Sequence, residues 1–229
     1  MKLGLVGRAP ASYDAAFMAA MARAYLDQTP WTRLRLTAVR DLVEPRPGER
    51  VLDLGCAAGA VTHFLSTFAC EPVGVDAETL AIETAATLFP ALRFEVADVT
   101  RLPFADSSFE KAVAADLVEH LEDDALGRML AEVRRLLVPG GTLSIYTPNR
   151  HHPIELLKER DIVLARNETH VGLRDARELA ATLEDAGFVV ERSEWRPSYI
   201  PGLGVVERLG GGRFESLRYR LCVRARAPS

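Results

Sequence analysis

The stretch Val51-Leu52-Asp53-Leu54-Gly55-Cys56-Ala57-Ala58-Gly59-Ala60-Val61-Thr62-His63 decides the fold of this chain. An apolar run closes on an acid, a turn with two glycines follows, and a helical pattern begins at Ala60. Glycine has no Cβ, so such a turn lets a ligand approach the backbone, and the first N–H groups of the helix point toward it. The stretch therefore predicts a strand, a turn and a helix that together cradle a ligand.

Short apolar runs alternate with helical patterns on both sides of this stretch. We expect strands over 50–54, 72–76, 92–97, 111–115 and 142–147, and helices over 60–68, 79–88 and 125–137. Apolar strands separated by helices are typical of a parallel sheet covered on both faces. Ligands of such sheets bind beyond the carboxyl ends of the strands.

The flanking segments complete the predicted architecture. Helices over 12–27 and 32–43 precede the sheet, and helices over 153–165 and 175–186 follow it, together with closing strands over 188–195 and 216–226. The glycine-rich segment 197–212 reads as an apolar loop. We expect one α/β domain over 1–229, a Rossmann-like, doubly wound, mostly parallel seven-stranded sheet with helices on both faces. It has an N-terminal helical cap (1–48), a cofactor-binding core (49–149), and an acceptor-side insert with the closing strands (150–229).

Composition excludes several classes of function. A net charge of −4 gives no broad electrostatic reason to bind nucleic acid. Only three of the basic residues are lysines, so an isolated arginine is weak evidence for an anion site. No apolar stretch approaches the roughly 20 residues that cross a bilayer, and the opening apolar run is too short for a secretion signal. We therefore expect no stable membrane insertion.

The three cysteines, Cys56, Cys70 and Cys222, are far apart and fit no metal-ligand spacing. An odd count without a disulfide framework suits a reducing compartment. The sequence predicts a cytoplasmic protein with no metal.

Three acids, Asp53, Asp76 and Asp98, end successive predicted strands. Asp76 follows Gly55 at about the 20-residue spacing at which an acid meets the ribose of a nucleotide. A carboxylate suits vicinal hydroxyls because it accepts two hydrogen bonds at once. Asp98 is placed to accept from an adenine amino group. The alternative is that these acids merely cap helices or turns.

Together these motifs resemble the class I S-adenosylmethionine-dependent methyltransferases over roughly residues 30–195. Val51–Gly59 is similar to that family's first motif, and Val75-Asp76 and Ala97-Asp98-Val99 to its ribose-binding and adenine-binding segments. The segments 115–121 and 137–143 resemble those after the fourth strand and before the fifth. Leu102–Phe109 resembles a stretch of the small-molecule branch, typified by quinone-biosynthesis methyltransferases.

The resemblance implies a site for S-adenosyl-L-methionine, with S-adenosyl-L-homocysteine as the product. The residues that it assigns to cofactor binding are Tyr13, Asp53, Gly55, Cys56, Ala57, Gly59, Asp76, Ala77, Asp98, Val99, Ala115 and Asp116. One departure is Ala57, where the family usually has glycine. The added methyl restricts φ and narrows the approach to the cofactor. We expect binding to persist with the loop slightly displaced.

By the same resemblance, the reaction moves a methyl group to an O, N or C atom of a small molecule by in-line displacement. Alignment and exclusion of water are then the main contributions of the protein. A general base helps when the acceptor is a hydroxyl, and the candidates are His120, His151 and His152. We expect His170 to make a structural hydrogen bond and His63 to pack or face solvent.

Acceptor specificity in the family lies in the N-terminal helices and the insert after the fifth strand. Phe17, Met21 and Tyr25 form a stripe that could roof the site, and Tyr13 could fold over the methionine end of the cofactor. The apolar segment 199–209 could cover an apolar acceptor or pack in a dimer. The expected partner is a small-molecule acceptor. The chain is expected to be a monomer or a homodimer.

Two other functions stay open at this point. A non-catalytic module that binds S-adenosylmethionine would keep the same acids. An NAD-dependent oxidoreductase is less favoured, because its G-x-G-x-x-G turn needs three glycines and this turn has two. Methylation of nucleic acid is disfavoured by the absence of a basic tract with interleaved aromatic residues.

Overall fold

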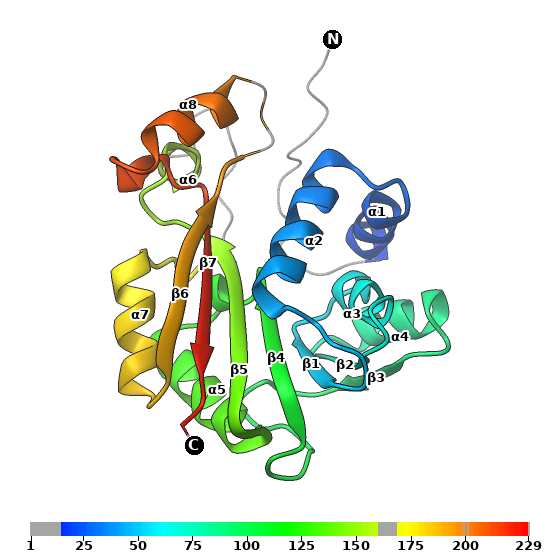
Figure 1. The fold of residues 1–229 in the computed structure, drawn as a ribbon. Helices are drawn as coiled ribbons and strands as arrows, with labels where there is room; N and C mark the ends of the chain where they lie inside the picture. Colours follow the sequence, from blue (N-terminus) through cyan, green and yellow to red (C-terminus); the bar gives the residue numbers. More distant parts are fainter. Residues whose placement is uncertain (1–14, 160–168, 199, 201, 229) are drawn as a thin grey trace.

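A computed structural model describes residues 15–159, 169–198, 200 and 202–228, and every structural statement below concerns these residues. Seven strands form one sheet in the order β3-β2-β1-β4-β5-β7-β6 (Figure 1). Their bounds are β1 Arg50–Leu54, β2 Glu71–Asp76, β3 Arg93–Val96, β4 Phe109–Ala115, β5 Leu137–Pro148, β6 Val189–Arg196 and β7 Arg220–Arg226. β7 alone runs in the opposite direction to the other six strands. The expected mostly parallel, seven-stranded sheet is confirmed.

Helices connect the strands and cover the sheet. They are α1 Ala15–Leu26, α2 Pro30–Val43, α3 Ala60–Ser66, α4 Thr79–Leu88, α5 Asp123–Leu136, α6 Pro153–Glu159, α7 Ala176–Asp185 and α8 Leu203–Gly210, with short 3₁₀ helices η1 Val118–His120 and η2 Glu215–Leu217. Local chemistry sets several starts. Thr29 caps α2 by accepting from the N–H of Thr32, and Asp175 forms a capping box with Glu178 at α7. Within the described residues, no helix has the length and apolar character to cross a membrane.

Alternating side chains on the strands build a core on each face of the sheet. Leu52 and Leu54 of β1 pack in a buried cluster with residues of α5 and α7. Val51, one residue earlier, belongs to a second buried cluster with residues of α2 and α3. Successive side chains of a strand point to opposite faces, so a single apolar strand feeds both cores. This is the doubly wound arrangement.

The N-terminal helices form the expected cap: α2 packs on β4, β5 and β7, and α1 lies next to α2 and against α4 (Figure 1). Met18 and Ala22 of α1 pack against Ala58, in the turn after β1. The buried stripe of α1 is therefore Met18, Ala22 and Tyr25; Phe17 and Met21, predicted to share the stripe with Tyr25, are only partly buried beside it.

The prediction of a loop over 197–212 was wrong in its second half, because α8 occupies 203–210. Glycines at both ends and in the first turn hide the helical pattern, since glycine lowers helix propensity. Fully buried Glu207 holds the helix by accepting from His152 Nε2 at 3.0 Å and from the N–H of Ser198. Those partners are distant along the chain, so local sequence does not reveal the helix. The last strand also begins later than expected, at Arg220, because 215–217 form η2.

Candidate active site

The turn after β1 has the backbone that its sequence predicts. Gly55 and Gly59 have positive φ of 67° and 78°. A Cβ on Gly55 would lie 2.9 Å from Leu117 Cδ1, and one on Gly59 would lie 2.8 Å from Phe94 Cζ. Both glycines are therefore favoured by their positive φ, and a Cβ at either would also displace a neighbouring side chain. Ala57 between them also has a positive φ, 46°, which residues other than glycine rarely adopt.

Asp76 ties this turn to the end of β2. Its Oδ2 accepts from the N–H of Ala57 at 2.9 Å, and its Oδ1 accepts from the N–H of Glu78 at 3.0 Å. The N–H of Cys56 also donates to Val75 O at 2.9 Å, so two bonds join the loops. A carboxylate has about four acceptor positions, which leaves capacity for two hydroxyl donors. The expected ribose contact fits this geometry.

Asp53 lies beneath the turn. Its side chain is 1% exposed and accepts from Thr62 Oγ1, in α3, at 2.6 Å. Burial raises the pKa of Asp53 to about 6, against the opposing effect of the Thr62 hydrogen bond. Asp53 thus braces the first turns of α3.

Asp98 and its neighbours lie on the far side of Asp76. Asp98 is exposed, and its Oδ1 accepts from both the N–H and the hydroxyl of Thr100 at 2.8 Å, which lowers the pKa of Asp98. It caps a turn, as the alternative interpretation expected, and its second oxygen remains available for an adenine. Val99 is buried in the core and Ala77 is exposed.

Asp116 ends β4 and is paired with two arginines. Arg35 Nε of α2 lies 2.7 Å from Oδ2, and Arg220 Nη1 of β7 lies 2.7 Å from Oδ1. Burial opposes ionisation of Asp116, but Arg220 and Arg35 outweigh it and lower its pKa. Arg35 also donates to Ala115 O at 2.9 Å and lies over the Trp31 ring. This clamp fixes the cap helix over the strand ends.

His120 is the candidate base nearest these strand ends. Its Nδ1 lies 2.9 Å from Thr169 O. Burial lowers the pKa of His120, and the charges of Asp116 and Asp76 act in the opposite direction. Its half-buried ring therefore lies close to the acids that follow β2 and β4.

The other two candidate bases face elsewhere. His151 is half exposed and pairs with Asp175, the cap of α7, at 3.2 Å. His152 is fully buried, pairs with Glu207 at 3.0 Å and packs against the Tyr219 ring. The structure does not bring either ring to His120 through any contact among the described residues. Tyr13 lies outside those residues.

The two remaining histidines divide between packing and the site. His63 bonds Tyr25 Oη and stacks on Phe89, so it packs as expected. His170 Nδ1 is buried without a hydrogen-bond partner, 3.7 Å from Glu155 Oε2. The structural hydrogen bond predicted for His170 is thus not made by its Nδ1.

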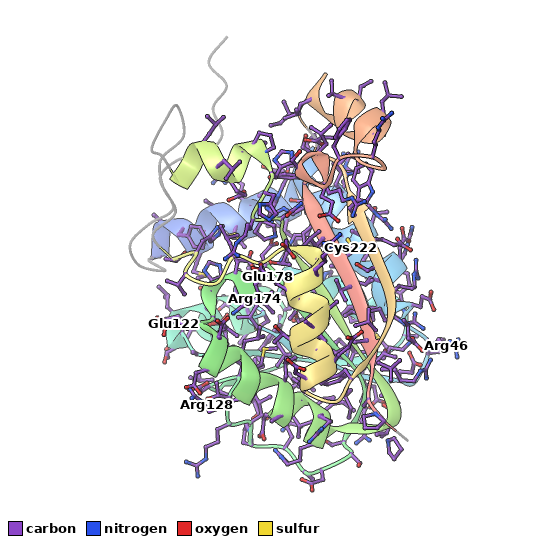
Figure 2. The ribbon with its side chains drawn as sticks, turned by 90° about the vertical axis from the view of Figure 1, so that its left-hand side faces the viewer. Arg46, Glu122, Arg128, Arg174, Glu178 and Cys222 are labelled. Carbon is purple, nitrogen blue, oxygen red and sulfur yellow. The ribbon has the colours of Figure 1, made fainter. Side chains whose placement is uncertain are left out.

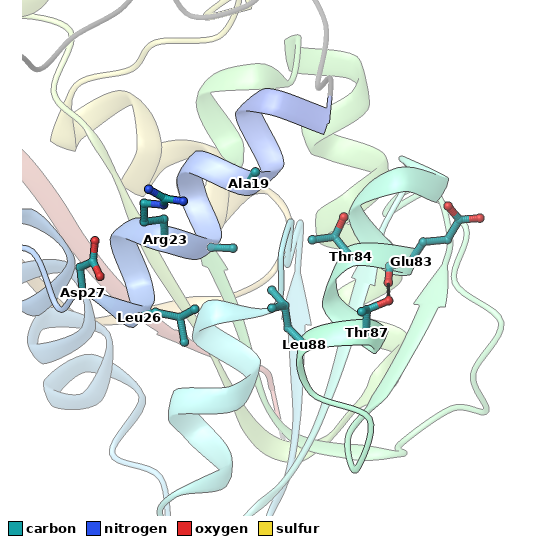
Figure 3. A pocket seen from close by; sticks show the side chains of 9 residues that line it. Ala19, Arg23, Leu26, Asp27, Glu83, Thr84, Thr87 and Leu88 are labelled. Carbon is teal, nitrogen blue, oxygen red and sulfur yellow. Dashed lines mark hydrogen bonds between the residues drawn. The ribbon is translucent and has the colours of Figure 1, made fainter.

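A groove of about 600 Å³ lies between α1 and α4 (Figure 3). Ala19, Arg23 and Leu26 of α1 face Thr84, Thr87 and Leu88 of α4 across it. None of the residues predicted to bind the cofactor lines this groove. The candidate site is therefore the strand ends and not this groove.

Sequence reasoning gave no role to Glu119, Arg35 or Arg220. Glu119 is 1% exposed and accepts from Thr147 Oγ1 at 3.0 Å. Burial and, after it, the charge of Asp116 raise the pKa of Glu119 to about 7, against the opposing charge of Arg220. The only local signal for Glu119 was its place beside His120. Arg35 and Arg220, which pair with Asp116, lie far from it in the sequence.

The fold and the acids at the strand ends define a doubly wound α/β protein with a candidate nucleoside site. Comparison with known proteins agrees with this class. Residues 51–141 match a family described as Methyltransferase domain. A probable S-adenosylmethionine-dependent methyltransferase of Mycolicibacterium smegmatis is 30% identical over 165 residues, which cover 72% of this chain and 62% of that protein.

One further relative is similar in sequence, and one solved structure is similar in fold. A demethylmenaquinone methyltransferase of Beutenbergia cavernae is 34% identical over 113 residues, 49% of this chain and 46% of that protein. A solved S-adenosylmethionine-dependent methyltransferase structure from Methanosarcina mazei shares the fold, with a TM-score of 0.66 at 19% identity over 83% of this chain and 96% of that one. Residues 51–141 therefore form a methyltransferase domain, and the chain is similar to S-adenosylmethionine-dependent methyltransferases. It spans about half to three fifths of the length of the curated relatives that it matches.

Proposed function

We propose that this chain catalyses transfer of the methyl group of S-adenosylmethionine to a small-molecule acceptor. The observation that carries the proposal is the Asp76 carboxylate at the end of β2, bonded to the N–H of Ala57 in a turn where Gly55 and Gly59 have no room for a Cβ. A turn so bare of side chains suits a ligand that contacts backbone, and the carboxylate suits the two ribose hydroxyls.

The cofactor, when bound, would supply a sulfonium methyl group; a nucleophile attacks its carbon in line with the C–S bond, which breaks to leave S-adenosylhomocysteine. We assign Asp76 to its ribose and Asp98 to its adenine, with the backbone from Gly55 to Gly59 and the end of β4 beside the methionine part. Met18 and Ala22 of α1 pack over Ala58, which supports a role for the cap in excluding water from the turn. Alignment of this kind is worth on the order of 7–11 kcal/mol of barrier.

His120 is the base that we favour if the acceptor is a hydroxyl. Its Nδ1–H donates to Thr169 O, so Nε2 keeps a lone pair. His151 and His152 are less favoured. His151 pairs with Asp175 near the surface, and His152 is buried and hydrogen-bonded to Glu207. The methylated atom, O, N or C, follows from the acceptor.

The acceptor that we propose is uncharged or weakly charged, including apolar molecules. The net charge of −4 does not favour nucleic acid, and the relative from Beutenbergia cavernae is named for a quinone-type molecule. All three cysteines are free and buried, which suits the cytoplasm that we propose as the location. We propose a monomer or a homodimer.

The test has two stages. Calorimetric titration with S-adenosylmethionine and, separately, with NAD should give binding of the first and none of the second. Incubation with S-adenosylmethionine and a panel of phenols, amines and quinols should then form S-adenosylhomocysteine. Tight binding of NAD with no response to S-adenosylmethionine would refute the proposal.

The second candidate function is a non-catalytic module that binds the same cofactor. It is favoured by the same acids and by the position of His151 and His152 away from His120. Binding of S-adenosylmethionine without S-adenosylhomocysteine formation on any acceptor would support it.

A further inference from the structure

Glu119, His120 and His170 bring three ligand-type side chains together outside the predicted cofactor residues. Each can offer one oxygen or nitrogen atom, and the three atoms lie within 4.8 Å of one another. Glu119 and His120 come from η1, after β4, whereas His170 comes from the loop before α7. The cluster is thus assembled by the tertiary fold from distant segments.

Hydrogen bonds to backbone carbonyls of residues 118–121 hold the loop that carries His170 against η1. The N–H of Gly172 donates to Glu119 O at 2.9 Å, and Arg174 donates to Val118 O at 3.0 Å and to Leu121 O at 3.1 Å (Figure 2). A Cβ on Gly172 would lie only 2.0 Å from Leu121 O. These contacts hold the imidazole and the carboxylate close together without any contribution from an ion.

Glu119 and His120 each have a hydrogen-bonded outer partner that leaves one ligand atom for a cation, and a carboxylate lies near the imidazole of His170. Thr147 Oγ1 donates to Glu119 Oε2 at 3.0 Å, which leaves Oε1. Thr169 O accepts from His120 Nδ1, which leaves Nε2. Glu155 Oε2 lies 3.7 Å from His170 Nδ1. Metal-bound histidines are usually oriented in this way, by a carbonyl or carboxylate on the second nitrogen.

The charges around the cluster leave a place for a cation. Glu119 is a buried carboxyl, and no lysine or arginine in the described part of the chain pairs with it. Arg35 and Arg220 both pair with Asp116 instead, although the charge of Arg220 also acts on Glu119. A buried carboxylate is costly unless it is paired, protonated or bound to a metal.

We propose that Glu119, His120 and His170 bind a first-row divalent cation, for which Zn²⁺ is the best match. Two imidazoles and one carboxylate suit zinc and its neighbours and not Mg²⁺ or Ca²⁺, which take oxygen ligands. Three protein ligands leave a further coordination position open, as in catalytic zinc sites. The sequence by itself predicts no metal, because none of its cysteines has ligand spacing and the two histidines are far apart in the chain.

The open position gives the cation a substrate class, and with the cation on its Nε2, His120 acts as a ligand in place of the base role proposed above. The open position would accept an oxygen donor, such as a phenol or enol, and a metal-bound hydroxyl loses its proton more readily. This consequence rests on the proposed function, whereas the cation site does not.

The test is a titration of the full-length chain, without a histidine tag and stripped with chelator, using Zn²⁺ in competition with a chromophoric chelator. We expect one equivalent bound by the wild type and at least tenfold weaker binding by His170→Ala. His151→Ala is the matched control, because it removes a histidine outside the cluster, and it should bind Zn²⁺ within twofold of the wild type. Equal Zn²⁺ affinity in His170→Ala and the wild type would overturn the proposal.

A second variant and a second readout keep the outcomes distinct. Glu119→Gln keeps the shape of the side chain and removes its charge, so it should also weaken Zn²⁺ at least tenfold; circular dichroism verifies the fold of each variant. If His170→Ala does not fold, the result with Glu119→Gln decides. Affinity for S-adenosylmethionine, measured in parallel, tests the proposed function separately: its absence with Zn²⁺ still bound would refute that function and leave the cation site standing.

Discussion

At the scale of single residues, the acids at the strand ends have different structural duties. Asp76 joins two loops through the N–H groups of Ala57 and Glu78, while Asp53 is buried against Thr62. Asp76 can therefore serve a ligand and the turn at once, whereas Asp53 supports the turn from below.

Replacement of Asp76 by alanine should weaken S-adenosylmethionine binding at least tenfold. The charge-assisted bonds to the ribose are worth roughly 1.5–3 kcal/mol, and the bond to Ala57 is lost as well. Calorimetric titration measures the effect. Glu78→Ala is the control, since it removes an exposed acid two residues away. Equal affinities for the two variants would remove Asp76 from the ribose role.

Asp53 should make stability depend on pH. The pKa of Asp53 is about 6 in the folded protein, against the ordinary value of 3.8 that applies to the unfolded chain. Between pH 3.8 and pH 6, therefore, only the folded state keeps the proton. The stabilising contribution of Asp53 is present below pH 4 and falls as the pH rises to 6. Asp53→Asn does not titrate, so its stability relative to the wild type should increase by up to about 3 kcal/mol from pH 4 to pH 7. Urea denaturation at each pH measures both free energies of unfolding. If they change with pH by the same amount in the wild type and in Asp53→Asn, the prediction is wrong.

At the scale of elements, the packing of the 169–174 loop on η1 depends on a glycine. Gly172 approaches Leu121 O too closely for any side chain, and its N–H bonds Glu119 O. Gly127, in α5, has open space around the position of a Cβ. The two glycines therefore differ in what an added methyl group does.

Gly172→Ala and Gly127→Ala should change stability in opposite directions. Overpacking at Gly172 should lower the free energy of unfolding by about 1–3 kcal/mol. Alanine at Gly127 should raise it by about 0.5–1 kcal/mol, because alanine is the better helix former. Chemical denaturation of the three proteins gives both values. A Gly172→Ala variant as stable as the wild type would contradict the close packing of this loop.

At the scale of the whole molecule, the Asp116 clamp joins the cap to the sheet. Arg35 comes from α2 and Arg220 from β7, so one carboxylate at the end of β4 links three elements. The clamp lies beside the cofactor turn and fixes how far the cap helix α2 can move from it.

Asp116→Asn should destabilise the protein by about 3 kcal/mol, since it leaves two largely buried guanidinium groups without a carboxylate. Asparagine tolerates the left-handed backbone at this position, so strain does not confuse the result. Asp124→Asn breaks an exposed pair with Arg128 and should cost under about 1 kcal/mol. Thermal and urea unfolding compare the two; similar losses would show that the clamp is no stronger than a surface pair.

The strand ends and the glycine turn could be read from the sequence because their signals are local. β1 begins and ends where the apolar run does, and α4 matches its predicted bounds. The helix α8 and the Asp116 clamp could not be read, because Glu207, Arg35 and Arg220 bond partners far away in the chain. The prediction of no metal used cysteine spacing, which carries no information on His120 and His170.

The sequence determined the class of sheet, the turn after β1 and the order of the acids around it. It could do so because the spacing of apolar residues and the positions of glycines fix the backbone within a few residues. Only the tertiary structure decided that Glu119, His120 and His170 share one place and that Asp116 is clamped. These groups meet by the crossing of segments separated by dozens of residues, and side-chain contacts of that range leave no periodic trace in the chain.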